Sequence, residues 1–279
     1  GRLFARGAAD DKGGIAVHLG AMRAFLGNPP IGVKIFVEGE EEIGSPSMAA
    51  LLKEYGCDLG ADVFVIADAV NWKVGEPALT TTLRGVVDAV VTVSTLETGL
   101  HSGQFGGVVP DALTALSKLL ATLHDDKGNV AIEGLVSAPD PEVEYDEERL
   151  REETGILEGV EWIGDGMASA RMWTKPAASV LAIDATPVKD ASNTLVPSAR
   201  AKVSIRIAPG DTVENAAKAL REHLLANAPW GAKVTVEPGQ GGAGTTIDLS
   251  SEKAQAALAA LRDGFGIDAV QIGTGGSIP

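Results

Sequence analysis

Hydrophobic and polar positions in the first part of the chain follow two different periods. Residues 14–26 repeat apolar side chains at helical spacing, whereas 31–37 and 62–67 are short apolar runs rich in β-branched residues. The first pattern predicts an amphipathic helix, and the two runs are typical of buried strands. A second helix is predicted between the runs, with Ser45 as its N-cap and Pro46 at its first position. Strand, helix and strand in this order predict a parallel sheet with right-handed crossovers.

The pattern changes near residue 80, where apolar and polar positions alternate more regularly. Strands are predicted at 84–94, 200–207 and 232–237, and helices at 110–124 and 212–226. Residues 125–190 are acidic and poorly periodic, and we interpret them as an insertion with partial helix. A helix over 250–263 and a strand over 267–272 would then return to the first sheet.

These elements predict an α/β fold in two domains. Residues 1–80 and 244–279 are expected to form the first domain, an open mixed sheet with helices on both faces. Residues 81–243 are expected to form an inserted α+β domain, in which helices cover one face of a sheet. A chain of 279 residues is long enough for one or two such domains.

Composition narrows the classes of function. The chain has 38 acidic and 23 basic residues, and its formal net charge of -15 repels the phosphates of nucleic acids. It contains no run of about 18 apolar residues that could span a membrane. A single cysteine excludes an internal disulfide, and no secretory leader is visible. We therefore expect a cytoplasmic protein that binds neither nucleic acid nor membrane.

Acidic residues gather at three places that the predicted sheet brings to one edge. Asp10 and Asp11 precede the first helix, EGEEE at 38–42 follows the first predicted strand, and Asp68 follows the second. Ligands of open α/β sheets bind at the carboxyl ends of the strands. Carboxylates that converge there repel one another unless cations or protons offset their charge, so one interpretation is a metal site. The other is that each cluster is a solvated turn, and spacing alone does not decide between them.

Five motifs extend along the whole chain. They are FARGAADDKG at 4–13, EGEEEIGS at 38–45, HSGQFGG at 101–107, SNTLVPSARAKVSIR at 192–206 and GGSIP at 275–279. In this order they resemble the di-zinc metallopeptidase family of carnosine dipeptidase, aminoacylase, glutamate carboxypeptidase and succinyl-diaminopimelate desuccinylase. The dipeptidase branch is the most similar one, because of HSGQFGG and GGSIP.

The resemblance implies roles for the acidic residues. Asp10 resembles the carboxylate that bridges two metal ions, and its peptide bond to Asp11 would be cis. Glu42 and Asp68 each resemble a ligand of one metal ion. Glu41 resembles the general base that activates the metal-bound water. The implied cofactors are two divalent metal ions, zinc by preference, with manganese or cobalt as alternatives.

The resemblance also implies groups from the inserted domain. His101 resembles a histidine that reaches from the lid of a neighbouring subunit and stabilises the developing oxyanion, so we expect a homodimer through the lid. Asn193 or Thr194 lies where the family places another lid group near the substrate. Arg206 resembles the arginine that binds the substrate carboxylate through its guanidinium fork. Its other interpretation is a solvent-facing residue on an alternating strand.

The function implied is hydrolysis of a peptide or peptide-like amide bond in a small substrate with a free carboxylate. Gly276 and Ser277 resemble the loop that holds the C-terminal end of such a substrate. Deacylases of N-acyl amino acids and carboxypeptidases use the same kind of site, so an acyl amino acid is an alternative substrate. The pocket for the substrate side chain cannot be predicted from these motifs.

The histidines depart from the family pattern. The family also uses two metal-binding histidines, one in an H-x-D motif before Asp10 and one after GGSIP, and the printed sequence contains neither. Of its four histidines, only His101 lies in a functional motif. Zinc prefers nitrogen or sulfur ligands together with carboxylates. We therefore expect this segment alone to bind zinc weakly and to be inactive.

Two other classes of function fit part of the pattern. A cluster of carboxylates alone suits Mg²⁺ or Mn²⁺ and phosphoryl transfer, although the sequence has no G-x-x-x-x-G-K-[ST] loop. A non-catalytic remnant of the fold that serves dimerisation or binding is the second alternative, because the two histidines are missing.

Overall fold

The computed structural model describes residues 4–276, which divide into two compact units. The first unit contains the chain up to Leu79 together with Leu249–Val270. The second contains Thr80–Asp248 together with residues 271–276. Residues 244–248 and 271–276, which the sequence patterns assign to the first domain, thus lie in the second unit.

Three α-helices lie in the described part of the first unit. They are α1 (Lys12–Ala24), α2 (Met48–Leu59) and α8 (Glu252–Phe265), and the short 3-10 turn η1 (Glu41–Ile43) precedes α2. Helix α2 begins later than predicted, because Ser45 has a left-handed backbone (φ 50°) instead of a capping conformation. Glu40 supports the helix start instead, since its Oε2 accepts a hydrogen bond from Ser47 N at 3.0 Å.

The two apolar runs at 31–37 and 62–67 are not strands in this structure. No described residue pairs with either run in a ladder, and their side chains are exposed, for example Val33 at 47% and Phe64 at 72%. A strand requires a hydrogen-bonded neighbour, whereas apolar spacing reports only that a segment suits burial. The prediction of strands at these two runs is therefore wrong, although the mixed α/β class holds.

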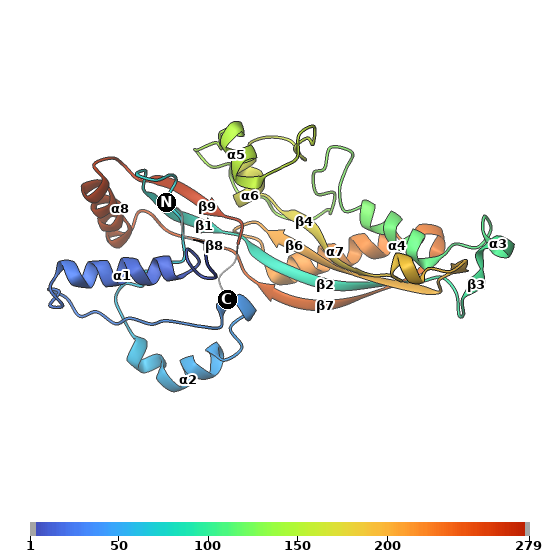
Figure 1. The fold of residues 1–279 in the computed structure, drawn as a ribbon, viewed down its shortest axis with the longest axis horizontal. Helices are drawn as coiled ribbons and strands as arrows, with labels where there is room; N and C mark the ends of the chain where they lie inside the picture. Colours follow the sequence, from blue (N-terminus) through green and yellow to red (C-terminus); the bar gives the residue numbers. More distant parts are fainter. Residues whose placement is uncertain (1–3, 277–279) are drawn as a thin grey trace. The chain divides into compact units, whose positions relative to one another are not determined.

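A four-stranded antiparallel sheet forms the centre of the second unit. Its strands, in the spatial order β4-β6-β2-β7, are β4 (Ala177–Asp184), β6 (Ser198–Ile207), β2 (Gly85–Ser94) and β7 (Lys233–Gly242). Helices α4 (Ala112–Ala121) and α7 (Val213–Ala226) lie along one face of this sheet (Figure 1). Strand β4 lies inside the predicted insertion and was missed, because AASVLAID does not alternate between apolar and polar positions.

The hydrophobic core of the second unit lies between the sheet and these two helices. Alternate residues of β2 and β6 point into it, including Val91, Val203 and Ile205, each of which is fully buried. Leu116 of α4 and Leu220 of α7 pack against them. Each such side chain contributes about 1.5–3 kcal/mol by leaving water. The strand predicted at residues 200–207 is thus confirmed as part of β6, with Val203, Ile205 and Ile207 on its buried face.

The described chain also forms two smaller sheets, one of three strands and one of two. Strand β1 (Ala78–Leu83) lies between β8 (Thr245–Thr246) and β9 (Val270–Thr274), and β3 (Leu100–His101) pairs with β5 (Thr194–Leu195). The short helix α3 (Ser102–Phe105) follows β3. The predicted return of 267–272 to a parallel first sheet is wrong, because β9 pairs with β1 directly before residue 84.

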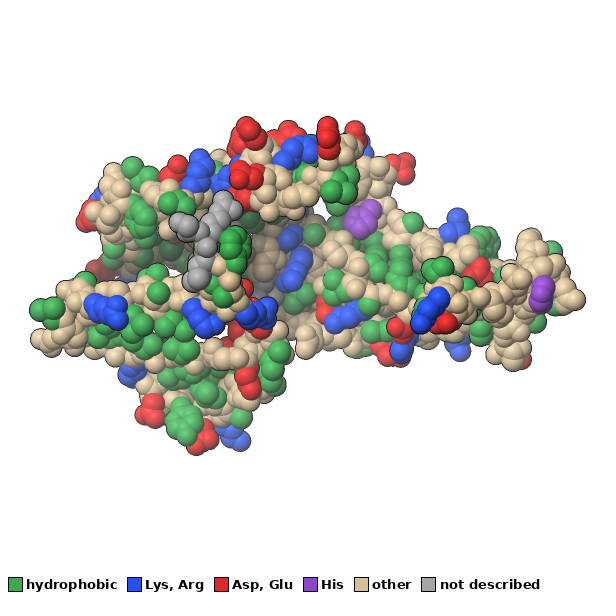
Figure 2. Space-filling view, in the orientation of Figure 1, with side chains coloured by type: hydrophobic (Ala, Val, Ile, Leu, Met, Phe, Trp, Pro, Cys, Tyr) green, Lys and Arg blue, Asp and Glu red, His purple; other side chains and the backbone are tan. Residues whose placement is uncertain are grey.

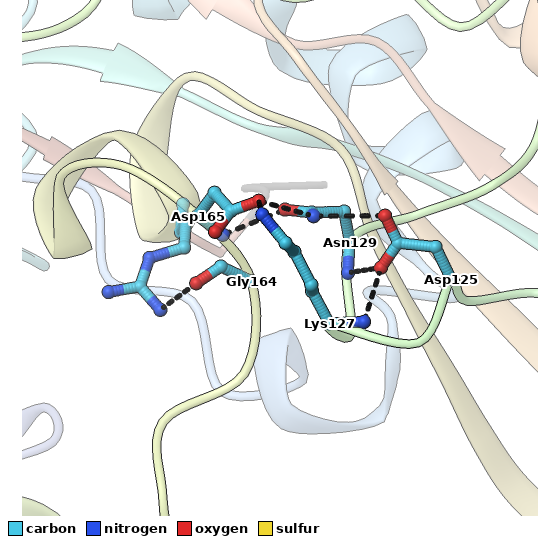
Figure 3. Close-up of polar contacts among 6 residues, drawn as sticks. Asp125, Lys127, Asn129, Gly164 and Asp165 are labelled. Carbon is cyan, nitrogen blue, oxygen red and sulfur yellow. Dashed lines mark hydrogen bonds and ion pairs between the residues drawn. The ribbon is translucent and has the colours of Figure 1, made fainter.

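The insertion between α4 and β4 contains α5 (Glu147–Thr154) and α6 (Ala168–Trp173). Five residues, Asp125, Lys127, Asn129, Gly164 and Asp165, form a polar clip that joins its first loop to a later one (Figure 3). Asn129 Nδ2 donates to Asp125 Oδ2 at 3.0 Å and to Asp165 Oδ2 at 3.2 Å, and Gly164 N donates to the Lys127 carbonyl oxygen at 2.7 Å. These bonds order an insertion that has little apolar core.

Charged side chains of both signs cover the insertion around α5 (Figure 2). Helix α5 carries two ion pairs one turn apart, Arg149 with Glu153 at 2.6 Å and Arg151 with Glu147 at 3.1 Å. Pairs of this kind contribute about 0.3–0.5 kcal/mol each. Within residues 4–276, no helix has the length and hydropathy needed to cross a membrane.

Candidate functional site

The start of α1 packs against the segment that carries Asp68. Asp11 caps the helix, since its Oδ1 accepts a hydrogen bond from Gly14 N at 2.9 Å. A Cβ added to Gly14 would lie 2.9 Å from the carbonyl oxygen of Ala67, so glycine is what allows this close approach. The Asp10–Asp11 peptide bond is cis. Asp10 and Asp68 therefore come from segments that lie side by side within the first unit.

Members of the acidic run at 38–42 have different surroundings. Glu40 holds the chain before α2 through Ser47 N, whereas Glu41 and Glu42 begin η1. The Oε1 atom of Glu38 is buried and has no hydrogen-bond partner among the described residues. A buried oxygen without a partner carries a desolvation cost, which a proton or a cation would remove.

Burial and neighbouring negative charges raise the pKa values of two carboxylates in the first unit, Glu41 and Asp68. Burial raises the pKa of Glu41, and the charges of Asp68, Glu42, Glu38 and Asp10 raise it further. Burial likewise raises the pKa of Asp68, with Asp10, Asp11 and Glu42 as the neighbouring charges. The three acidic clusters of the sequence thus converge into one region of negative potential, although the two strands that were predicted to bring them together, at 31–37 and 62–67, are not strands.

The donor chemistry of this region fits a divalent cation, because carboxylate oxygens are hard ligands and a bound cation would offset their repulsion. Across residues 4–276, however, no three or more His, Cys, Asp or Glu side chains are arranged to hold a metal ion. The region therefore fits a metal in charge and chemistry without a formed coordination shell. The metal-ligand roles of Asp10, Glu42 and Asp68 remain predictions.

His101 and the predicted lid residues meet at one end of the second unit's sheet. His101 pairs with Thr194 across β3 and β5, and the Asn193 carbonyl oxygen accepts a hydrogen bond from Ser102 N at 2.9 Å. The ring Nδ1 of His101 accepts from Gly103 N at 3.1 Å, and the side chain is exposed. Because Nδ1 is an acceptor here, a neutral ring carries its proton on Nε2, which can donate outward.

Arg206 lies near the other end of the same sheet. On β6 it stands opposite Val86 of β2 and Ala177 of β4, and its side chain is half-buried rather than fully solvent-facing. Gly276 follows β9, and its N–H donates to Thr274 Oγ1 at 3.3 Å. Ser277, the other predicted member of this loop, lies outside the described residues.

The predicted substrate groups of the second unit therefore form two sets. Thr194 precedes Ser198, which pairs with Ser94 at the end of β2, whereas Arg206 pairs with Val86 near the start of β2. Ten residues of extended strand cover about 30 Å. His101 with Asn193 and Thr194, and Arg206 with Gly276, are consequently separated by roughly the length of β2.

Two further residues have site-like surroundings: Glu38, which the sequence showed only as one member of the EGEEE run, and Arg84, which lies in none of the motifs. Glu38 has the buried unpaired oxygen described above. Arg84 lies between β1 and β2 and is only 8% exposed. The available signal for Arg84 was a charged residue placed directly between two apolar, strand-like segments, TTL and GVV.

Comparisons with known proteins agree with the motifs. Residues 1–278 match the model of peptidase family M20/M25/M40. The chain is 36% identical to the cysteinylglycine-S-conjugate dipeptidase of Corynebacterium striatum, over 100% of the chain and 63% of the relative. It is 26% identical to the Beta-Ala-His dipeptidase of Homo sapiens, over 100% of the chain and 59% of the relative. The chain thus spans about three fifths of the length of these relatives.

Solved structures show the same fold. The structure of the dipeptidase Dug1p from Saccharomyces cerevisiae superimposes with a TM-score of 0.79 at 26% identity, covering 98% of this chain and 61% of that one. Human carnosine dipeptidase 1 gives a TM-score of 0.78 at 26% identity, with 98% and 61% covered. The ordered motifs, the fold and the match along the chain lead to one conclusion: this chain belongs to peptidase family M20/M25/M40.

Proposed function

We propose that the protein to which this chain belongs is a metal-dependent dipeptidase that acts on small substrates with a free carboxylate. The observation that carries the proposal is the convergence of Glu41, Asp68 and Asp10 in the first unit: beyond the effect of burial, the charges of Asp68 and Asp10 raise the pKa of Glu41, and the charge of Asp10 raises the pKa of Asp68. The names of the relatives support the substrate class, because cysteinylglycine conjugates and Beta-Ala-His are both small peptides.

Asp10, Glu42 and Asp68 are the residues that would hold two divalent metal ions, zinc first, with manganese or cobalt as alternatives. When bound, such ions supply Lewis acidity and lower the pKa of water toward neutrality. Two observations support this assignment. The Asp10 segment packs against the segment of Asp68 through Gly14 and Ala67, and the charge of Glu42 is among those that raise the pKa of Asp68.

Glu41 is the proposed general base. It would accept the proton of the attacking water and deliver it to the nitrogen of the leaving amine. Glu42 next to it can serve a metal ion while Glu41 faces the water, because the two side chains begin the same turn. Burial and neighbouring charges raise the pKa of Glu41, and a raised pKa suits a carboxylate that must also release its proton as an acid.

Residues of the second unit would bind the substrate. Arg206 offers two parallel N–H donors to the substrate carboxylate, and the Gly276–Ser277 loop would hold the same end. His101 would donate from Nε2 to the developing oxyanion, with Asn193 or Thr194 beside it. We propose that His101 acts in a partner subunit's site, which makes a homodimer necessary. The distance of roughly one β2 length between His101 and Arg206, about 30 Å, supports this division.

We also propose a cytoplasmic location. Cys57 is exposed and unpaired in the structure, and an exposed free thiol suits a reducing compartment.

The test uses the protein expressed from its complete reading frame and loaded with Zn²⁺ or Mn²⁺. Glu41→Gln is expected to lower kcat for a panel of dipeptides by about 100-fold or more, because it removes general-base catalysis. Glu40→Gln is the matched control, since Glu40 supports α2 and is expected to leave kcat within about threefold of the wild type.

Hydrolysis that survives Glu41→Gln would contradict the assignment of the base. Hydrolysis of N-acyl amino acids but of no dipeptide would move the protein to the deacylases of the same family. A metal-loaded wild type that hydrolyses neither class of substrate would contradict the proposed function.

A further inference from the structure

Helix α6 in the second unit is held at both ends by charged side chains from distant parts of the chain. At its start, the Glu144 carboxylate accepts hydrogen bonds from Ala168 N and Ser169 N, each at 3.1 Å. At its end, Arg84 Nη1 donates to the carbonyl oxygens of Arg171 at 3.1 Å and Lys175 at 3.2 Å. Negative charge at the start and positive charge at the end both complement the helix dipole. A helix of six residues is thereby fixed in place.

Arg84 is an unusual buried cation. Arg84 is 8% exposed, its Nη1 donates to backbone carbonyl oxygens, and it forms no ion pair with any described carboxylate. Its Nε is buried without a hydrogen-bond partner in the described chain. A buried charge is costly unless it is paired, so an arginine in this setting indicates either a missing anion or a task that needs the charge.

The turn after β9 lies against Arg84. Arg84 N donates to the Thr274 carbonyl oxygen at 3.2 Å, which joins the backbone at residue 84 to the start of the turn. A Cβ added to Gly275 would lie 2.6 Å from Arg84 Nη2 and 3.0 Å from the Met172 carbonyl oxygen of α6. The turn at 274–276 therefore packs against the Arg84 guanidinium and the end of α6. Any side chain at Gly275 would displace that turn.

A second arginine, Arg206, lies close to Arg84. Burial and the neighbouring positive charge of Arg206 lower the pKa of Arg84 to about 10. With a pKa of about 10, the Arg84 guanidinium keeps its charge at neutral pH. Residue 206 lies opposite Val86 in the register of β6 and β2, so this end of the sheet brings two arginine residues close together.

We propose that Arg84 is a positioning residue for substrate selection: it supports the 274–276 turn and keeps a fixed positive charge beside Arg206, so that the two arginines together select substrates with a free carboxylate. The inference rests on the proposed function, and it adds a residue that the motifs do not contain. In this proposal Arg206 and the turn contact the substrate carboxylate. Arg84 does not contact it, but holds the turn in position and adds positive charge near Arg206. The two arginines would favour a small peptide with a free C-terminal carboxylate over the same peptide with an uncharged C-terminal amide.

The test compares a dipeptide with the same dipeptide carrying a C-terminal amide, in the metal-loaded protein from the complete reading frame. Arg84→Met keeps an unbranched side chain but removes the guanidinium and its charge. It is expected to raise KM for the free dipeptide about tenfold and to leave KM for the amide within about twofold, with kcat little changed. Arg84→Lys restores the charge without the fork and should recover part of the discrimination.

Arg171→Met is the matched control. Arg171 also lies on α6 and also binds backbone carbonyl oxygens, those of Ile163 and Gly164, but its side chain is directed to the insertion. This variant should leave the ratio of the two KM values unchanged. A binding measurement that needs no turnover repeats the comparison: calorimetry of both ligands with each Arg84 variant in a Glu41→Gln background.

Equal losses for the free dipeptide and its amide in Arg84→Met, or a fall in thermal stability alone, would overturn the inference and leave Arg84 a structural residue. Should Arg84→Met fail to fold, Arg84→Lys and Gly275→Ala decide the question by the same ratio, and an unchanged ratio in both would overturn it. A wild type that hydrolyses neither ligand would contradict the proposed function and this inference with it, whereas an active wild type with unaltered discrimination in the variants contradicts the inference alone.

Discussion

At Gly273, a single hydrogen atom in place of a side chain allows β9 to reach α6. A Cβ at this position would lie 2.5 Å from Trp173 Cβ and 2.6 Å from Thr82 Oγ1. Trp173 is itself 5% exposed and packs edge-on against Tyr145, with ring centroids 5.9 Å apart. The tryptophan therefore has little room to move away, and the glycine is a packing requirement rather than a turn signal.

Replacing Gly273 with alanine is expected to lower the free energy of unfolding of the second unit by about 1–3 kcal/mol, because the added methyl group overpacks a rigid site. Urea denaturation followed by tryptophan fluorescence measures this change. Gly264→Ala on α8 is the opposite control, since a Cβ there meets nothing within 4 Å. Alanine in a helix is favoured over glycine by about 0.5–1 kcal/mol, so that variant should not destabilise the chain. Equal effects of the two substitutions would contradict the packing argument.

At the scale of elements, the helices were easier to predict than the strands because their signals are local. Helix α7 begins where Thr212 accepts a hydrogen bond from Asn215 N at 3.1 Å, and α4 begins where Asp111 accepts from Leu113 N and Thr114 N at 3.0 Å. Capping residues and helical spacing lie within one stretch of sequence. A strand depends on a partner that the stretch itself does not contain, which is why 31–37 and 62–67 were mistaken for strands and β4 was missed.

The polar clip makes a prediction about low pH. The side-chain hydrogen bond from Asn129 leads the interactions that hold the pKa of Asp125 below its ordinary value of 3.8, and the bond from Lys127 leads those that lower the pKa of Asp165. A carboxyl group whose pKa is depressed in the folded state stabilises that state above the unfolded pKa, and this contribution is lost as the pH falls through the folded pKa. The loops at 125–129 and 163–165 should therefore loosen only in acid below pH 3.8.

Carbon-13 NMR titration of the aspartate carboxyl groups measures this directly. Asp125 and Asp165 should both titrate below the ordinary value in the native chain, and Asn129→Ala should move both back toward it, since it removes a donor shared by the two carboxylates. Titration of either group at or above 3.8 in the unaltered chain would show that the clip is not formed in solution.

At the scale of the whole molecule, the candidate site was only partly predictable. Glu41 lies in one of the motifs and Asp68 was singled out by the family resemblance, and the structure brings their charges together within the first unit. Arg84 could not be predicted, because its burial depends on α6 and on the turn at 274–276, both of which lie far from residue 84 in the sequence. The division of substrate groups between the two ends of β2 likewise emerges only from strand register.

The central claim is that one chain supplies the base and its partner supplies the oxyanion donor. Mixing two inactive variants of the complete protein, His101→Ala and Glu41→Gln, tests this most directly. Random pairing makes half of the dimers mixed, and each mixed dimer would contain one intact site, so we predict recovery of about a quarter of wild-type dipeptidase activity. Confirmed formation of mixed dimers without any recovery would contradict the account, because a site built from a single chain leaves both halves of every mixed dimer inactive.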